Sequence, residues 1–408
     1  MISYCFYSIV PPHLRCMHPW RYLGFVLLGA ALAAGAAPRV PVSDAEVLET
    51  LPGRPGDPAA VELRRLRGAL AADTHNADAA ARLARRYFDM AMAEGDPRYV
   101  GYAEAALRPW PETAATPVEI LVLHGMLRQY RHDFARGMAD FALALQAEPA
   151  NIEARAWRAA IFMVQADYAA ARLECASLSE HATELHATAC SSYVEATTGH
   201  ARAAHERLAA ALARRTDVEP GFLVWVITRL AEMAWRTGDL AAAELHFRAG
   251  LALGVNDNFL LAAYADFLLE WNRAAEVIPL LRNWARSDTL LLRLALAARQ
   301  LKLAEGEKFA RTLGERFADA ALRGEKLHLQ EEARYLLDLK GDARAALAAA
   351  SENYRTQREP RDALILMEAA LAARDPAAAA PALQWLESSG FESARLRDVA
   401  LRLKALKP

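Results

Sequence analysis

The chain has 408 residues, a formal net charge of −2 and an apolar content of 54%. Its arginine pairs are interleaved with acidic residues, so it lacks the clustered positive charge that nucleic-acid-binding proteins need. Alanine, leucine and arginine dominate, and alternating apolar-polar runs of strand length are scarce. This composition predicts an all-α protein without a nucleic-acid partner. The even spread of apolar residues favours a repeat array over separate globular cores.

Residues 1–37 are typical of a secretory signal peptide. An apolar run from Tyr22 to Ala37 follows Arg21 and contains the small-x-small sequence Ala34-Gly35-Ala36 that signal peptidase accepts. The run is shorter than the ~20 apolar residues of a membrane span, so we expect cleavage and no stable membrane insertion afterwards. A retained N-terminal membrane anchor is the alternative. Met17 would begin a leader of ordinary length, and our hypothesis is that it is the true start.

Lysine is absent before Lys302 and arginine takes its place, which indicates a high-GC bacterial genome. Together with the leader, this predicts an exported bacterial protein, either periplasmic or secreted. Residues 38–58 follow as an arm and linker, because their prolines and glycines forbid a long helix. Helical apolar stripes begin at residue 59, first from Ala59 to Ala71 and then from Asp78 to Glu94.

The sequence repeats itself with a period of 34 residues. Asp133-Phe134 recurs as Asp167-Tyr168, and Gly125 falls at the same repeat position as Ala159. Such a period is typical of helix-turn-helix arrays. The units that we assign begin at Val118, Ile152, Leu185, Val224, Asn258, Leu292, Leu327 and Arg361.

The unit from Val118 to Asn151 resembles the tetratricopeptide repeat family. Counted from Val118, the small residues Gly125, Gly137 and Ala144 stand at positions 8, 20 and 27, and Phe141 stands at position 24. The resemblance implies a right-handed α-α superhelix of about nine helix pairs over residues 59–390, with residues 391–408 as a C-terminal capping helix. Helix-pair repeats of the Sel1 type, with a period of about 36, are the alternative.

The sequence contains no recognised catalytic or nucleotide-binding motif, and we expect no catalytic, cofactor-binding or metal-binding residues. An enzyme with an unrecognised site is kept as an alternative. Two cysteines follow the leader, Cys175 and Cys190. The resemblance places them on helices that pack together, so an exported chain would form either a disulfide or two buried free thiols.

The resemblance also implies that the first helix of each unit lines a concave groove. Carried over residue by residue, the groove positions that we expect to contact a partner are Met126, Tyr130, Tyr193, Trp225, Glu232, Trp235, Arg236 and Asp266. Aromatic residues beside arginine and acids are typical of a peptide-binding hot spot. We therefore predict a non-enzymatic scaffold or adaptor of the cell envelope that binds another protein. The alternative is an accessory protein of envelope assembly or polymer export that holds a polysaccharide.

Overall fold

The computed structural model describes residues 43, 56–215, 217–325 and 327–406. The predicted signal peptide (1–37) and most of the predicted arm (38–58) lie outside these residues. The chain divides into two compact units, Met1–Ala60 and Val61–Pro408. Of the first unit the structure describes Ser43 and residues 56–60. The fold below is that of the second unit.

In the described part of the chain there are 20 α-helices and no strand, which confirms the all-α prediction. None of these helices is long and apolar enough to span a membrane. In chain order they are α2 (Pro58–Ala72), α3 (Ala77–Glu94), α4 (Arg98–Leu107), α5 (Val118–Tyr130), α6 (Phe134–Ala147), α7 (Ile152–Val164), α8 (Tyr168–Leu178), α9 (Glu184–Thr197), α10 (Ala201–Ala213), α11 (Pro220–Arg236), α12 (Leu240–Ala252), α13 (Asn258–Glu270), α14 (Ala274–Leu281), α15 (Asp288–Gln300), α16 (Glu305–Leu322), α17 (Leu329–Arg334), α18 (Ala343–Tyr354), α19 (Pro360–Ala373), α20 (Ala380–Ser389) and α21 (Ala394–Ala405). The π-helix η1 (Tyr335–Lys340) continues α17, and the 3₁₀ turn η2 (Pro376–Ala379) precedes α20.

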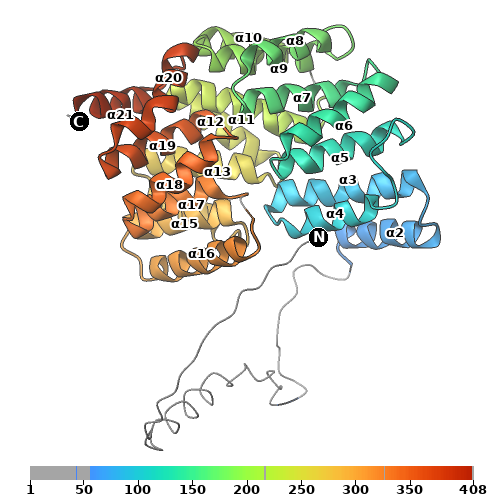
Figure 1. The fold of residues 1–408 in the computed structure, drawn as a ribbon, viewed down its shortest axis with the longest axis horizontal. Coiled ribbons are helices and arrows are strands. Elements are labelled where there is room, and N and C mark those ends of the chain that lie inside the picture. The colour runs from blue at the N-terminus through green and yellow to red at the C-terminus, as the bar shows by residue number, and fades with distance from the viewer. Residues whose placement is uncertain (1–42, 44–55, 216, 326, 407–408) are drawn as a thin grey trace, which may run out of the picture. The chain divides into compact units, whose positions relative to one another are not determined.

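The helices pack in consecutive pairs that form a right-handed superhelix, as the resemblance implied (Figure 1). In the described residues nine pairs run from α3–α4 to α19–α20, with α2 and α21 at the two ends. Helices α5, α7 and α13 begin at the residues that the period predicted. Helix α11 begins four residues before Val224, since Pro220 occupies its first turn and the Glu219 carboxylate accepts hydrogen bonds from two backbone amides there.

The turn inside several of the pairs follows one pattern. The second residue after the first helix often has a positive φ, such as 59° at His132 and 61° at Ala166. An aspartate then caps the second helix: the Asp167 carboxylate accepts a hydrogen bond from Ala170 N at 3.0 Å, and Asp239 does the same for Ala242. Each such cap stabilises its helix by about 1 kcal/mol. In these pairs the recurring aspartate is therefore the local signal that sets where the second helix begins.

Within a pair, the two helices meet at an apolar interface, called the seam below. There a small residue on one helix faces a large residue on the other. A Cβ atom added at Gly125 on α5 would lie 2.5 Å from Cε1 of Phe141 on α6. Phe141 is fully buried there. The close approach of the two helices therefore requires glycine at position 125, which is the packing that the repeat positions predicted.

The last repeats lie against repeats that are far away in the sequence. The Arg358 backbone amide donates to Val164 O at 2.7 Å, and the Trp385 indole donates to the Tyr168 hydroxyl at 2.7 Å. The Ala201 amide donates to the Glu392 carboxylate at 2.6 Å. These contacts place α18–α21 beside α7–α10, so the superhelix folds back on itself instead of ending as an open spiral.

Candidate partner-binding interior

Six of the eight predicted partner-binding residues lie on three successive first helices. They are Tyr193 on α9, Trp225, Glu232, Trp235 and Arg236 on α11, and Asp266 on α13. All six are half-buried. All except Trp225 line one of two adjoining cavities of about 140 and 160 Å³. The repeat register therefore brings residues of three units together at the inner face of the superhelix.

An aromatic ladder of His186, Phe222, Trp225 and Tyr193 connects α9 with α11. The His186 and Phe222 rings stack with centroids 4.0 Å apart, and Phe222 stacks on Trp225 at 6.0 Å. Trp225 meets Tyr193 edge-on at 5.9 Å. All four rings remain partly exposed. The ladder thus offers aromatic surface that its own packing already holds in place, at little further cost in side-chain entropy.

Arg229 stands behind this ladder on α11. Its guanidinium carbon lies 5.0 Å from the Tyr193 ring centroid and 4.2 Å from that of Phe259, within the range of cation–π attraction. The side chain is buried and forms an ion pair with Glu232 at 2.9 Å. One buried arginine therefore links the aromatic residues of α9, α11 and α13.

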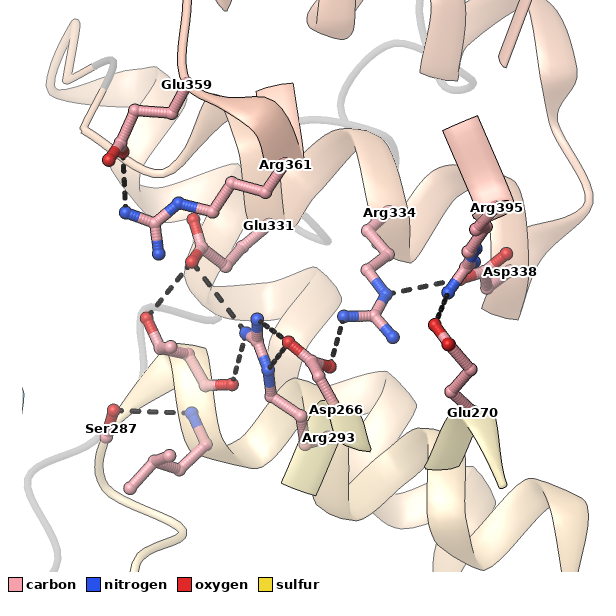
Figure 2. Close-up of polar contacts among 12 residues, drawn as sticks. Asp266, Glu270, Ser287, Arg293, Glu331, Arg334, Asp338, Glu359, Arg361 and Arg395 are labelled. Atoms are coloured by element: carbon pink, nitrogen blue, oxygen red, sulfur yellow. Dashed lines mark hydrogen bonds and ion pairs between the residues drawn. The ribbon is translucent and has the colours of Figure 1, made fainter. Parts of the chain in front are cut away.

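An ion-pair network fills the next part of the interior (Figure 2). Asp266 on α13 lies between Arg293 of α15, at 2.7 Å, and Arg334 of α17, at 2.6 Å. Arg293 is only 2% exposed. Burial disfavours the charged carboxylate, but the attraction of the two arginines is stronger and holds the pKa of Asp266 well below its usual range. The network therefore stays charged at any ordinary pH.

The C-terminal helices cover this interior. Arg361 of α19 lies 5.3 Å from the Phe259 ring centroid and pairs with Glu359 at 2.7 Å. Arg395 of α21 reaches Glu270 of α13 at 3.4 Å (Figure 2). At these residues the predicted concave groove is consequently reduced to the two small cavities, and the aromatic ladder lies beside them. Partner binding by the six converging residues stays a prediction.

Met126 and Tyr130 are separate from the other six. Met126 is 3% exposed and belongs to the apolar core that α2–α7 share. The Arg85 guanidinium lies over its sulfur at 3.6 Å, so Met126 has almost no surface to offer a partner, contrary to our expectation. Tyr130 is half-buried beside the same core, and burial raises its pKa to about 12. Neither residue lines the two interior cavities.

Cys175 on α8 and Cys190 on α9 are joined by a disulfide in the structure, with Cα atoms 5.4 Å apart. Of the two alternatives that the sequence left open, the structure thus has the bonded pair. The bond connects the second helix of one repeat to the first helix of the next. No group of three or more histidine, cysteine or acidic residues in the described ranges is placed to hold a metal ion.

Four arginines that organise this interior were not among the residues predicted from the sequence. They are Arg229, Arg293, Arg334 and Arg361. Arg293 follows the unit start at Leu292 directly, so it occupies the groove position that Phe259 holds after Asn258. The same rule applied to the less regular units would have found it. Arg361 and Glu359 had no such signal, because only the folding back of α19 brings them to α11.

Comparison with known proteins gives information on the fold alone. No family model matches the sequence, and no curated protein matches it either. The structure is similar to a chain in the crystal structure of the APC/C hetero-tetramer Cut9–Hcn1, with a TM-score of 0.50 and 14% sequence identity. That match covers 85% of this chain and 66% of the other.

The fold is TPR-like. A second solved structure, the TPR domain of P58(IPK), has 15% identity over 95% of this chain and 96% of that one, but its TM-score of 0.22 supports no argument. At such low identity the likeness to Cut9–Hcn1 shows a shared architecture and nothing about partners. This chain spans 66% of the length of the Cut9–Hcn1 chain that it matches.

Proposed function

We propose that this protein is a non-enzymatic scaffold that binds a segment of another protein at the inner face of its superhelix. The observation that carries the proposal is the aromatic ladder of His186, Phe222, Trp225 and Tyr193. Partly exposed aromatic rings beside arginine and acidic side chains are what protein interfaces use as hot spots. The TPR-like fold supports the same proposal, since helical solenoids present long surfaces to their partners.

Binding would use the ladder first and the cavities second. Apolar or aromatic side chains of the partner would pack on Trp225 and Phe222, whose rings are already fixed by stacking. The adjoining cavity of about 140 Å³ is lined by Glu232 and Arg236 and has room for a small side chain. The covered interior admits no long segment in this conformation. We therefore expect a short contact of a few residues rather than a peptide along the whole groove.

We further propose that the protein works in the bacterial cell envelope, either in the periplasm or after secretion. The apolar leader ending near Ala37 supports this location. The bond between Cys175 and Cys190 supports it as well, because disulfides persist mainly in oxidising compartments. N-terminal sequencing of the mature protein tests the location: a start near Pro38 is expected, and an intact leader would favour the membrane-anchored alternative.

Site-specific photo-cross-linking in cells tests the interaction. A benzophenone amino acid is placed at Trp225, and a matched control carries it at Leu245, which is 68% exposed on α12. We expect a discrete protein adduct from position 225 that is absent at position 245. Identical adducts at both positions, or none at 225, would contradict the proposal. An adduct that glycan-degrading treatment removes and protease does not would favour the polysaccharide alternative.

A further inference from the structure

A large cleft lies away from the aromatic ladder, between early and late repeats. It has a volume of about 870 Å³, within the range of about 300–1,000 Å³ that is usual for ligand sites. Tyr168 and Arg172 of α8 form part of one wall, and Tyr354 at the end of α18 and Trp385 of α20 form part of the other. The cleft therefore exists only because the superhelix folds back on itself.

Hydrogen bonds hold the walls in place. The indole N–H of Trp385 in one wall donates to the Tyr168 hydroxyl in the other at 2.7 Å. The Arg172 guanidinium donates to Thr198 Oγ1 at 2.9 Å. These bonds join α8 to α20 and to the residue that follows α9 before any ligand arrives, so a ligand would meet a preformed site.

The charge of the cleft has one sign. Three arginines line it, Arg172, Arg355 and Arg358, and no acidic residue does. Arg355 forms an ion pair with Glu352 at 2.6 Å. Neither Arg172 nor Arg358 has a carboxylate partner within 4.0 Å among the described residues. The interior network differs, since both of its central arginines have a carboxylate partner. Guanidinium groups that line a cleft without a carboxylate partner attract an anion.

The buried hydroxyl of Tyr354 also indicates that the cleft binds a ligand. Tyr354 is 5% exposed and lines the cleft, and its hydroxyl has no hydrogen-bond partner in the part of the chain that the structure describes. Leaving such a group unpaired costs about 1–3 kcal/mol. Burial raises the pKa of Tyr354, so the hydroxyl is neutral and can donate. It needs an acceptor, and a ligand in the cleft would supply one.

We propose that this cleft binds an acidic peptide segment of a partner protein. Carboxylates of the segment would pair with Arg172 and Arg358, and the Tyr354 hydroxyl would donate to one of its oxygens. The alanines of the lining are small and leave room for an extended backbone. The serines and Gln384 can form hydrogen bonds with the amides of that backbone. Trp385 is only 6% exposed and offers no open ring face on which a sugar could stack. The inference rests on the proposed role in protein binding.

Fluorescence anisotropy with the purified full chain tests the cleft. The probe is a fluorescein-labelled peptide of Glu, Asp and Ser, compared with the same peptide carrying Gln and Asn instead. The acidic probe alone is expected to bind, and added salt should weaken its binding. We expect R172Q/R358Q to weaken it at least about tenfold, because two charge-assisted hydrogen bonds are lost. Tyr354→Phe should weaken binding about tenfold without lowering thermal stability, because it removes a donor that is unpaired in the free protein.

The matched control is R108Q/R397Q, which removes two exposed arginines outside the cleft lining and changes net charge by the same amount. It should bind the acidic probe like the wild type. Equal weakening by both double variants, or no binding of the acidic probe, would overturn the inference. So would binding of oligogalacturonate in place of the peptide. If the acidic probe fails while Trp225 still cross-links to a protein, the cleft inference alone falls. If both fail, the proposed function falls with it.

Discussion

Two kinds of interface hold this superhelix together, and they use different physics. Within a helix pair the seam is apolar and fitted by volume, as where Gly125 meets Phe141. Across the interior, the first helices of successive repeats meet through charges, as where Asp266 of α13 joins Arg293 of α15 and Arg334 of α17. The seams stabilise the repeats themselves. The charged contacts join helices of different repeats, and the pair of Arg395 with Glu270 holds α21 over the inner face, where it limits the surface that a partner can reach.

The largest expected effect is on a seam. Phe141→Ala removes a fully buried ring and leaves a cavity between α5 and α6, so we expect a loss of about 4 kcal/mol in the free energy of unfolding. Chemical denaturation followed by circular dichroism measures it. Leu245→Ala is the matched control, because this leucine is 68% exposed and its loss should change stability by less than about 0.5 kcal/mol. Similar losses in both variants would mean that the seam is not the main source of stability.

A smaller effect is expected in the charged interior. Asp266→Ala leaves Arg293 buried at 2% exposure, with Glu331 as its remaining carboxylate at 3.9 Å. We expect a loss of about 3 kcal/mol. Replacing both partners by apolar residues, D266L/R293M, should recover part of it, because Arg293 is then no longer buried without its main partner, and Arg334 keeps Asp338 at 3.5 Å. If the double variant is less stable than Asp266→Ala, the ion pair itself contributes net stability to the fold, as the apolar seams do.

The smallest expected effect is a pH dependence of the unfolding free energy that comes from His132. Burial, with His328 nearby, lowers the pKa of His132 to about 4, whereas in the unfolded chain it titrates near 6.5. The unfolded state therefore binds more protons over this range, and stability falls as the pH falls. Between pH 7 and pH 5 the difference in unfolding free energy between wild type and His132→Asn should change by about 2 kcal/mol at most.

Asparagine suits this comparison because it tolerates the positive φ of 59° at position 132. Other groups in the protein titrate over the same pH range, but they are present in both proteins and cancel in the difference. Parallel stability curves for the two proteins would show that His132 is protonated as easily in the folded state as in the unfolded state. The measurement is urea denaturation at intervals of half a pH unit.

The sequence was sufficient to predict the repeats because their signals are local. A period of 34 residues, capping aspartates such as Asp133 and Asp239, and glycine at position 125 each act within one unit. They placed most first helices within a few residues of their observed starts. The superhelix that these pairs form could be predicted for the same reason, because each pair contacts its neighbours by the same rules.

The interior could be predicted only in part. Tyr193, Trp235 and Asp266 were found from repeat positions, and the structure brings them together. The covering by Arg361 and Arg395 depends on contacts between residues more than a hundred positions apart, such as Glu270 with Arg395. No periodic pattern encodes such a contact. Met126 was misplaced for a related reason, since the position rule does not show that Arg85 of an earlier helix lies over it.

The hydrogen bond between Trp385 and Tyr168 has a mechanical consequence. A solenoid whose repeats touch only their neighbours lengthens gradually under an applied force. Here the Trp385–Tyr168 hydrogen bond and the Arg358–Val164 backbone hydrogen bond connect repeats that are far apart in the sequence. Extension must break these bonds before the repeats can separate. The protein should therefore resist an applied force up to a threshold and then lengthen abruptly.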